Sequence, residues 1–225
     1  MTFSIAARCP ETGQFGIAIS SSSIAVGARC PWLLPGVGAV STQNITLPSL
    51  GPEVLALMEQ GLAPAEALDK VLTRNGYSQY RQVTAIDHLG RTAHFSGAQT
   101  LGNHNAVSGE QCVAAGNMLA DRSVIEAMVQ AFEHGEGQLA DRLLAAMKAA
   151  IAAGGEAGPV HSAAMVVVGE LTWPIINLRV DWADENPIGQ LEKLWDAYRP
   201  QVQDYIDRAL APDKSPGYGV AGDDR

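Results

Sequence analysis

The sequence predicts an α+β fold in which helices cover β-sheet. Segments with the composition of β-strands fall into groups along the chain, and two pairs of amphipathic helices separate these groups. Because strands and helices in this order pack as layers, we expect the sheets inside and the helices outside. The 225 residues contain no internal repeat and no low-complexity linker, so we expect a single domain over residues 1–225.

The chain begins with strands. Residues 2–20 predict a β-hairpin, because aromatic and branched residues flank the turn cluster CPETG. Residues 36–43 predict a third strand, whose glycines indicate a close approach of the backbone. Segments 51–61 and 63–76 each carry a proline near the start and a glycine at the end, with apolar residues along one side. They predict a helical hairpin.

The same alternation continues in the middle of the chain. Residues 80–97 predict a strand, a turn at DHLG and a second strand, and residues 106–117 predict one further extended segment. Asp121 can cap a helix that continues to Phe132, and residues 138–155 carry leucine and methionine at helical spacing. We therefore expect a second helical pair that covers the sheet.

The C-terminal part adds two strands and a helix. The strands are predicted within residues 162–169 and 174–182. Residues 187–210 predict a C-terminal helix that Pro200 should kink or split, because proline cannot donate a helical hydrogen bond. Residues 211–225 have the proline, glycine and aspartate content of an extended tail.

Composition and charge narrow the possible partners. Hydrophobic residues make up 47% of the chain and charged residues 17%, which suits a globular protein with a large core. The net charge of -9 opposes binding to a phosphate backbone, so we expect no nucleic acid and favour a small-molecule or peptide substrate. No apolar stretch is long enough to span a bilayer, and no signal peptide is recognisable. We expect a cytoplasmic protein without membrane contact.

Common cofactor and metal motifs are not found in the sequence. It has neither of the usual glycine-rich phosphate loops, no nucleophile elbow, and no histidine spacing typical of zinc sites. Cys9, Cys30 and Cys112 are odd in number and form no C-x-x-C pair, which favours reduced thiols in the core. We therefore expect no cofactor and no metal.

Thr2 is the residue whose position suggests chemistry. If Met1 is removed, Thr2 carries both a hydroxyl nucleophile and an α-amine that can accept its proton. An α-amine has an ordinary pKa of about 7.7 to 8.0, so part of it is unprotonated near neutral pH. The alternative is that Thr2 is only a good strand residue.

The wider pattern resembles a known family. The stretch MTFSIAARCPETGQFGIAISSSSIAVGARCPWLLPGVGAVSTQ, with YRQVTAIDHLGRTAHFSG, AAGNMLA, HSAAMVVV, NLRVDW and SPGYGVAGD, is similar to the bacterial and archaeal domain of unknown function 1028. That family is grouped with the N-terminal nucleophile (Ntn) hydrolases. The resemblance implies their four-layer αββα sandwich, with two mainly antiparallel sheets flanked by helix pairs.

The resemblance also implies roles for several residues. Ntn hydrolases cleave amide bonds with an N-terminal Thr, Ser or Cys, which makes Thr2 the candidate nucleophile. Asn117, between Gly116 and an apolar run, is the first candidate for an oxyanion donor, with a turn or cap residue as the alternative. Ser21 lies where proteasome-like members of the superfamily carry an aspartate, and its hydroxyl could orient the Thr2 amine; a solvated strand end is the alternative.

Two further residues, Arg29 and Ser162, are candidates for the polar cluster around Thr2. Proteasome-like enzymes place a lysine near the nucleophile, whereas the first lysine here is Lys70, in a predicted surface helix. Arg29 could replace its charge, although a guanidinium serves only electrostatically. Ser162 is a further candidate member of the cluster, or simply the first residue of a strand.

Two hypotheses follow. The first is an Ntn-type amidohydrolase that cleaves a small amide or peptide-like substrate through Thr2. The second is a non-catalytic ligand-binding or scaffold protein that retains the αββα fold. We also expect a homodimer, because Tyr198, Val202, Tyr205 and Ile206 present more apolar surface on the terminal helix than its own core can cover.

Overall fold

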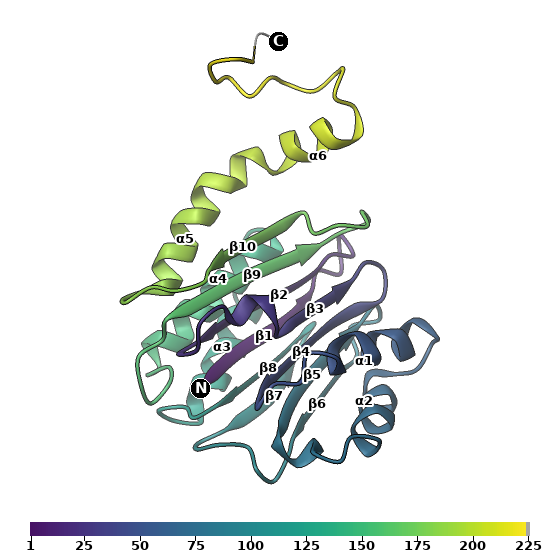
Figure 1. Cartoon of the computed structure of the whole chain (residues 1–225), viewed down its shortest axis with the longest axis vertical. Helices are drawn as coiled ribbons and strands as arrows, with labels where there is room; N and C mark the ends of the chain where they lie inside the picture. Colours follow the sequence, from purple (N-terminus) through teal and green to yellow (C-terminus); the bar gives the residue numbers. More distant parts are fainter. Residues whose placement is uncertain (224–225) are drawn as a thin grey trace.

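The computed structural model describes residues 1–223 and contains two antiparallel sheets. The six-stranded sheet has the order β10-β9-β2-β1-β8-β7, and the four-stranded sheet the order β3-β4-β5-β6 (Figure 1). The strands are β1 (Thr2–Arg8), β2 (Phe15–Ser21), β3 (Pro31–Leu34), β4 (Gly38–Asn44), β5 (Arg81–Asp87), β6 (Thr92–Ser96), β7 (Asn105–Gly109), β8 (Cys112–Asn117), β9 (Ser162–Val168) and β10 (Ile176–Val180). The expected mixture of α and β structure is confirmed.

The two sheets pack against each other through alternate side chains of their strands. On β1, Ala6 joins an apolar cluster with Ala39 and Ile86 of the four-stranded sheet. The intervening residues Phe3 and Ile5 point to the opposite face and enter the largest core cluster. This alternation follows from the two-residue repeat of a β-strand. Thr2 and Ser4 therefore belong to the same face as Ala6, between the sheets.

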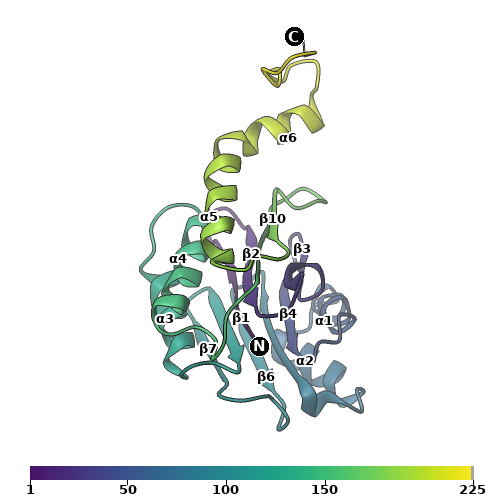
Figure 2. The ribbon, with the colours of Figure 1, turned by 60° about the vertical axis from the view of Figure 1, so that its left-hand side comes forward.

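Helix pairs cover the outer faces. Helices α1 (Leu50–Glu59) and α2 (Pro64–Thr73) bury their apolar sides with Val40, Val83 and Ala85 of the four-stranded sheet. Helices α3 (Ser123–Glu133) and α4 (Leu139–Ala152) pack on β1, β8 and β2 of the six-stranded sheet. Figure 2 shows the two helix pairs on opposite sides of the strands.

Most of the expected elements are present, but two were missed. Strand β3 begins at Pro31, on the edge of its sheet, and was not predicted. The single extended segment expected at 106–117 is a hairpin, because the chain turns at Glu110 and Gln111 and so divides it into β7 and β8. Gln111 has φ 59°, a left-handed conformation that is uncommon for residues other than glycine.

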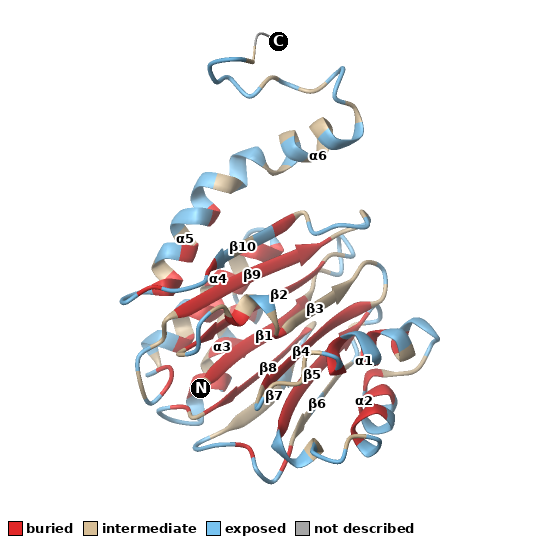
Figure 3. Ribbon diagram, in the orientation of Figure 1, coloured by how far each residue is buried: buried red, intermediate tan, exposed pale blue. Residues whose placement is uncertain are grey.

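The C-terminal segment extends from the body of the molecule. Helix α5 (Pro187–Tyr198) buries Leu191 and Trp195 in the core, and a 3₁₀ turn (Arg199–Gln201) separates it from α6 (Val202–Leu210). The division at Pro200 agrees with the expected kink. Helix α6 has no buried residue, and the chain beyond it projects away from the sheets (Figures 1 and 3). We call α6 and residues 211–223 the C-terminal arm.

Among the described residues, none of the helices has both the length and the apolar character required to cross a membrane.

Candidate functional site

Four of the five residues singled out in the sequence lie in one row across the ends of four neighbouring inner strands of the six-stranded sheet. Ser21 pairs with Ser162 across β2 and β9, and Thr2 pairs with Asn117 across β1 and β8. The β1–β2 register, with Phe3 opposite Ser20, completes the row by placing Thr2 beside Ser21. Thr2 is 6% exposed, and the other three side chains are at most 1% exposed. Strand pairing therefore brings together residues that are far apart in the sequence.

The hydroxyls of Thr2 and Ser21 form the centre of this row. Their oxygen atoms lie 3.2 Å apart, and both hydroxyls donate to the carbonyl oxygen of Met1. Ser21 Oγ also accepts a hydrogen bond of 3.0 Å from the backbone N–H of Ser23. The Met1 carbonyl carbon is bonded to the Thr2 nitrogen, so the peptide bond that would have to be cleaved lies directly beside both hydroxyls.

Asn117 has its side-chain amide fixed by a chain of hydrogen bonds. Gln82 Nε2 donates a hydrogen bond of 3.0 Å to the carbonyl of Gly116, which fixes the orientation of the Gln82 amide. The other amide atom, Oε1, is therefore the acceptor. It accepts from Asn117 Nδ2 at 3.1 Å and from Gln43 Nε2 at 2.8 Å. The orientation of Asn117 follows, and within residues 1–223 its buried Oδ1 has no hydrogen-bond partner.

The bonds around Gln82 belong to a buried polar layer between the sheets, which we define as Ser4, Ser41, Gln43, Gln82 and Asn117. Ser4 Oγ donates 2.7 Å to Gln43 Oε1 and lies 3.2 Å from Ser41 Oγ. Each of these side chains is at most 1% exposed. The layer joins the row to the four-stranded sheet, and a connected network of this kind holds its side chains in single orientations. Sequence reasoning missed Ser4, Ser41, Gln43 and Gln82.

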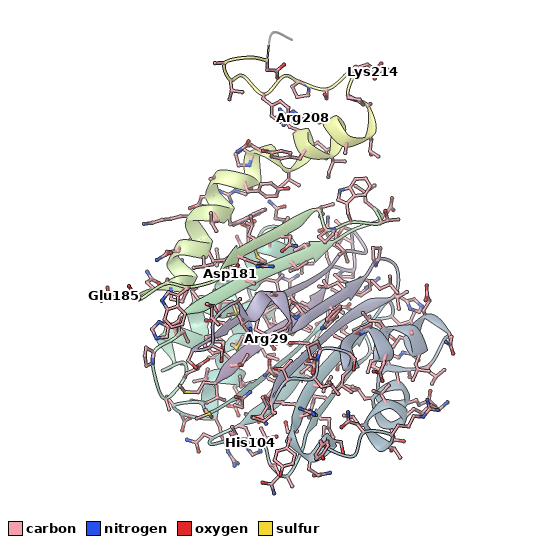
Figure 4. All side chains as sticks on the ribbon, viewed as in Figure 1. Arg29, His104, Asp181, Glu185, Arg208 and Lys214 are labelled. Carbon is pink, nitrogen blue, oxygen red and sulfur yellow. The ribbon has the colours of Figure 1, made fainter. Side chains whose placement is uncertain are left out.

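Ser162 and Arg29 hold the loop that follows Ser21. Ser162 Oγ donates 2.6 Å to the carbonyl of Ser23 and accepts from the N–H of Val26 at 3.3 Å. Arg29 Nη1 donates to the carbonyls of Ile24 and Ala25, at 2.6 and 3.0 Å. Figure 4 shows Arg29 beside β2, where the loop crosses the sheet. The guanidinium is thus bonded to its own loop, while Ser162 connects that loop to the row.

Glu156 is a buried acid that sequence reasoning also missed. It is 5% exposed, and Oε2 accepts a hydrogen bond of 3.3 Å from the N–H of Ser22. Within the described part of the chain, its Oε1 has no hydrogen-bond partner. Burial raises the pKa of this carboxyl to about 8, although the positive amino terminus and the Ser22 N–H act in the opposite direction. The only sequence signal was its place after Gly154 and Gly155, which end a helix.

Two cavities of the molecule lie away from this row. One of 320 Å³ is lined by α2 and β6 residues such as Leu68 and Phe95, and one of 420 Å³ by Ile151 and residues 184–188. Thr2 lines neither of them. Within residues 1–223, no three histidine, cysteine or acidic side chains are grouped as metal ligands, and Cys9, Cys30 and Cys112 are free thiols.

Comparisons with known proteins place the chain in a family. The model of the family of unknown function DUF1028 matches residues 2–191. The fold is similar to the crystal structure of a DUF1028 protein from Silicibacter pomeroyi, with 35% identity and a TM-score of 0.85, over 91% of this chain and 89% of that one. A second structure, Anbu (ancestral β-subunit) from Yersinia bercovieri, has 10% identity and a TM-score of 0.43, over 97% of this chain and all of that one, which is too low to establish a shared fold. No curated protein matches the chain. By sequence and by structure, the chain belongs to the DUF1028 family.

Proposed function

We propose that the protein is an Ntn-type amidohydrolase that uses Thr2 after removal of Met1. The observation that carries this proposal is the row of buried hydroxyl and amide groups with Thr2 at its centre. The arrangement of two stacked sheets between two helix pairs supports an assignment to the four-layer αββα sandwich of that class. We propose a small amide or peptide-like compound as the substrate.

The chemistry requires the Thr2 hydroxyl to lose its proton as it attacks. The α-amine accepts that proton while Oγ1 forms a bond to the substrate carbonyl carbon. The tetrahedral intermediate collapses, the carbon–nitrogen bond breaks, and the proton passes to the leaving amine. Water then hydrolyses the acyl ester and releases Thr2.

Ser21 is suited to orient the Thr2 amine. Its hydroxyl contacts the carbonyl group attached to the Thr2 nitrogen, so removal of Met1 leaves the new amine next to Ser21. The N–H of Ser23 fixes the Ser21 oxygen from the other side. A hydroxyl held in this way can accept an amine N–H and keep the nitrogen lone pair directed at Thr2 Oγ1.

Asn117 is the candidate donor for the oxyanion. Its amide carries two N–H groups, and the bond to Gln82 leaves capacity for a second donation. A donor that is fixed before the reaction stabilises developing charge without reorganisation. Ser162 and Arg29 act less directly in this proposal, because both hold the loop after Ser21, and Arg29 adds positive charge.

The second candidate is a non-catalytic ligand-binding or scaffold protein. The observation that favours it is the Met1 carbonyl, which occupies both hydroxyls of the row as long as Met1 is retained. The mass of the protein from its native host separates the two candidates. Removal of Met1 supports the hydrolase, whereas complete retention supports the binding protein.

The direct test is acylation of Thr2. Protein that begins at Thr2 is incubated with a panel of activated amides and esters, such as p-nitroanilides and p-nitrophenyl acetate, and adducts are mapped by mass spectrometry. We expect an acyl group on Thr2 and its loss in Thr2→Ala, with an unchanged melting temperature. Thr172→Ala, at an exposed threonine, is the matched control. Turnover retained in Thr2→Ala would reject the proposal.

A further inference from the structure

Glu156 crosses the amino-terminal end of β1. Its segment lies beside the end of β8, because Ala157 N–H donates 2.9 Å to the carbonyl of Met118 and Glu156 forms a β-bridge with Leu119. The carboxylate nevertheless reaches the N–H of Ser22, just past the end of β2. Since β1 lies between β2 and β8, the Glu156 side chain must pass over the start of β1.

The residues after Glu156 also lie against the chain start. A Cβ atom at Gly158 would be 3.1 Å from the Met1 terminal methyl group. The segment is held at its other end by a 3.0 Å bond from the N–H of Ala120 to the carbonyl of Gly155. Residues 155–158 thus pack beside Met1, which stays half-buried. We call this segment the cover, and Glu156 is its ionisable side chain.

The carboxyl group has one oxygen free to accept. Oε2 is bonded to Ser22, whereas Oε1 is buried and unpartnered within residues 1–223. A buried acceptor without a partner is destabilising, so an N–H donor at this place would be stabilised. The donor that chain topology brings here is the α-amine at the start of β1.

We infer that Glu156 binds the α-amine of Thr2 once Met1 has been removed, and so positions the base of the reaction. This inference rests on the proposed function for its catalytic meaning. The free Oε1 of Glu156 accepts an N–H of this amine and so fixes the direction of the nitrogen lone pair, which takes the proton of Thr2 Oγ1 when the amine is in its neutral form.

Other titratable groups near this end are few in the described chain. The Cys30 thiol is buried, which raises its pKa, and both Arg29 and the amino terminus oppose that rise. His161 is bonded through its backbone N–H to the carbonyl of Ser21, but its ring nitrogen Nδ1 lies 2.8 Å from the carbonyl of Ala183 and its ring stacks on Trp182. Glu156 is therefore the acid to test.

The test is a titration of the Thr2 amine that requires no substrate. The protein is produced as a cleavable fusion whose removal leaves Thr2 as the first residue. Limiting acetic anhydride then labels amines over a range of pH, and the rate at Thr2 is compared with that at Lys70 by peptide mass spectrometry. A carboxylate beside the amine delays its deprotonation, and the two groups titrate as a coupled pair.

We expect Glu156→Gln to lower the midpoint of Thr2 labelling by about one pH unit, which is about tenfold faster labelling at a fixed pH below the midpoint. Glu156→Asp should restore part of the shift. Glu170→Gln, at an exposed acid, should leave the midpoint unchanged. Melting temperatures identify any variant that fails to fold, and Glu156→Asp then carries the comparison.

Equal midpoints in wild type, Glu156→Gln and Glu156→Asp would overturn the inference. That result is distinguishable from failure of the proposed function, because the labelling assay reports only the amine. Loss of Thr2 acylation with a shifted midpoint would reject the hydrolase and retain the contact. Acylation with unshifted midpoints would retain the hydrolase and reject Glu156 as its positioning residue.

Discussion

Thr2 and Ser21 place their hydroxyl oxygens 3.2 Å apart on neighbouring strands, with the carbonyl of Met1 bound by both. Both residues are at least 94% buried, so bulk water cannot supply hydrogen bonds to their hydroxyls. Each hydroxyl therefore relies for its hydrogen bonds on the other hydroxyl and on the Met1 carbonyl. Any change at Met1 therefore changes the hydrogen bonding of both hydroxyls. The predictions below test this row and the groups that support it.

Ser21→Ala should slow acylation of Thr2 by roughly ten- to a hundredfold in protein that begins at Thr2, because the amine loses a hydrogen-bond partner. The rate of adduct formation, followed by intact mass, provides the measurement. Ser20→Ala is the matched control, since Ser20 is equally buried on the same strand but donates to the carbonyl of Ser162. Equal rates in the two variants would exclude a role for Ser21.

Gln82→Leu should destabilise the protein by about 2–4 kcal/mol, because Gln43, Asn117 and the carbonyl of Gly116 would lose buried partners. Urea unfolding measures the change in free energy. Gln99→Leu changes an exposed glutamine and should stay near wild type. A Gln82 variant as stable as this control would mean that the polar layer contributes no net stability.

Stability should depend on pH through Glu156. The folded state raises the pKa of this carboxyl to about 8, whereas the unfolded chain releases the proton near pH ~4.3. Between these values the folded protein binds more protons than the unfolded one, so the free energy of unfolding falls as pH rises. The fall is at most about 1.4 kcal/mol per pH unit and ends above pH 8.

Glu156→Gln should remove this contribution. The difference in unfolding free energy between the variant and wild type should grow in favour of the variant from pH 5 to about 8. Denaturant unfolding at several pH values measures it, with Glu170→Gln as the control. Parallel pH profiles for wild type and Glu156→Gln would contradict the raised pKa.

The C-terminal arm should mediate a homodimer. The Tyr205 ring stacks on Tyr198 with centroids 5.6 Å apart and is 41% exposed, and α6 buries no residue within the described chain. Arg208 binds the tail through the carbonyls of Pro216 and Gly217, which gives the arm a defined shape (Figure 4). Exposed apolar surface on a projecting element is typical of an interface.

Light scattering tests this prediction. Wild type should have the mass of two chains, and Ile206→Asp should shift it to one, because a charge would be buried in the interface. Tyr77→Ser, at an exposed tyrosine between α2 and β5, should leave the mass unchanged. A monomeric wild type would reject the dimer.

Much of the fold could be predicted from sequence because most elements carry local signals. Prolines and glycines mark the ends of α1 and α2, and the alternation in Phe3 and Ile5 marks β1. The β7–β8 turn was missed because Gln111 adopts a left-handed conformation without a glycine. Strand β3 was missed because its first residue, Pro31, is tolerated only at a sheet edge.

The candidate site was predictable only in part. Thr2 could be found from its place after Met1, and Ser21 and Asn117 from the family resemblance together with their places at strand ends. Their pairing with Thr2 follows from strand register. Gln82 and Glu156 could not be found, since each meets partners that lie on other elements. No local sequence pattern predicts such contacts, because they form only when the two sheets stack and residues 155–158 pack beside Met1.

The position of β1 has a consequence for the timing of maturation. This strand lies between β2 and β8, and its start is covered by residues 155–158, so both partners on that side are synthesised more than a hundred residues after Thr2. Met1 is therefore more accessible to an aminopeptidase while the chain is growing than after β8 has paired and residues 155–158 have packed beside it. Under the proposed function, removal of Met1 would compete with folding during synthesis of the chain, and the outcome would set the fraction of molecules that begin at Thr2.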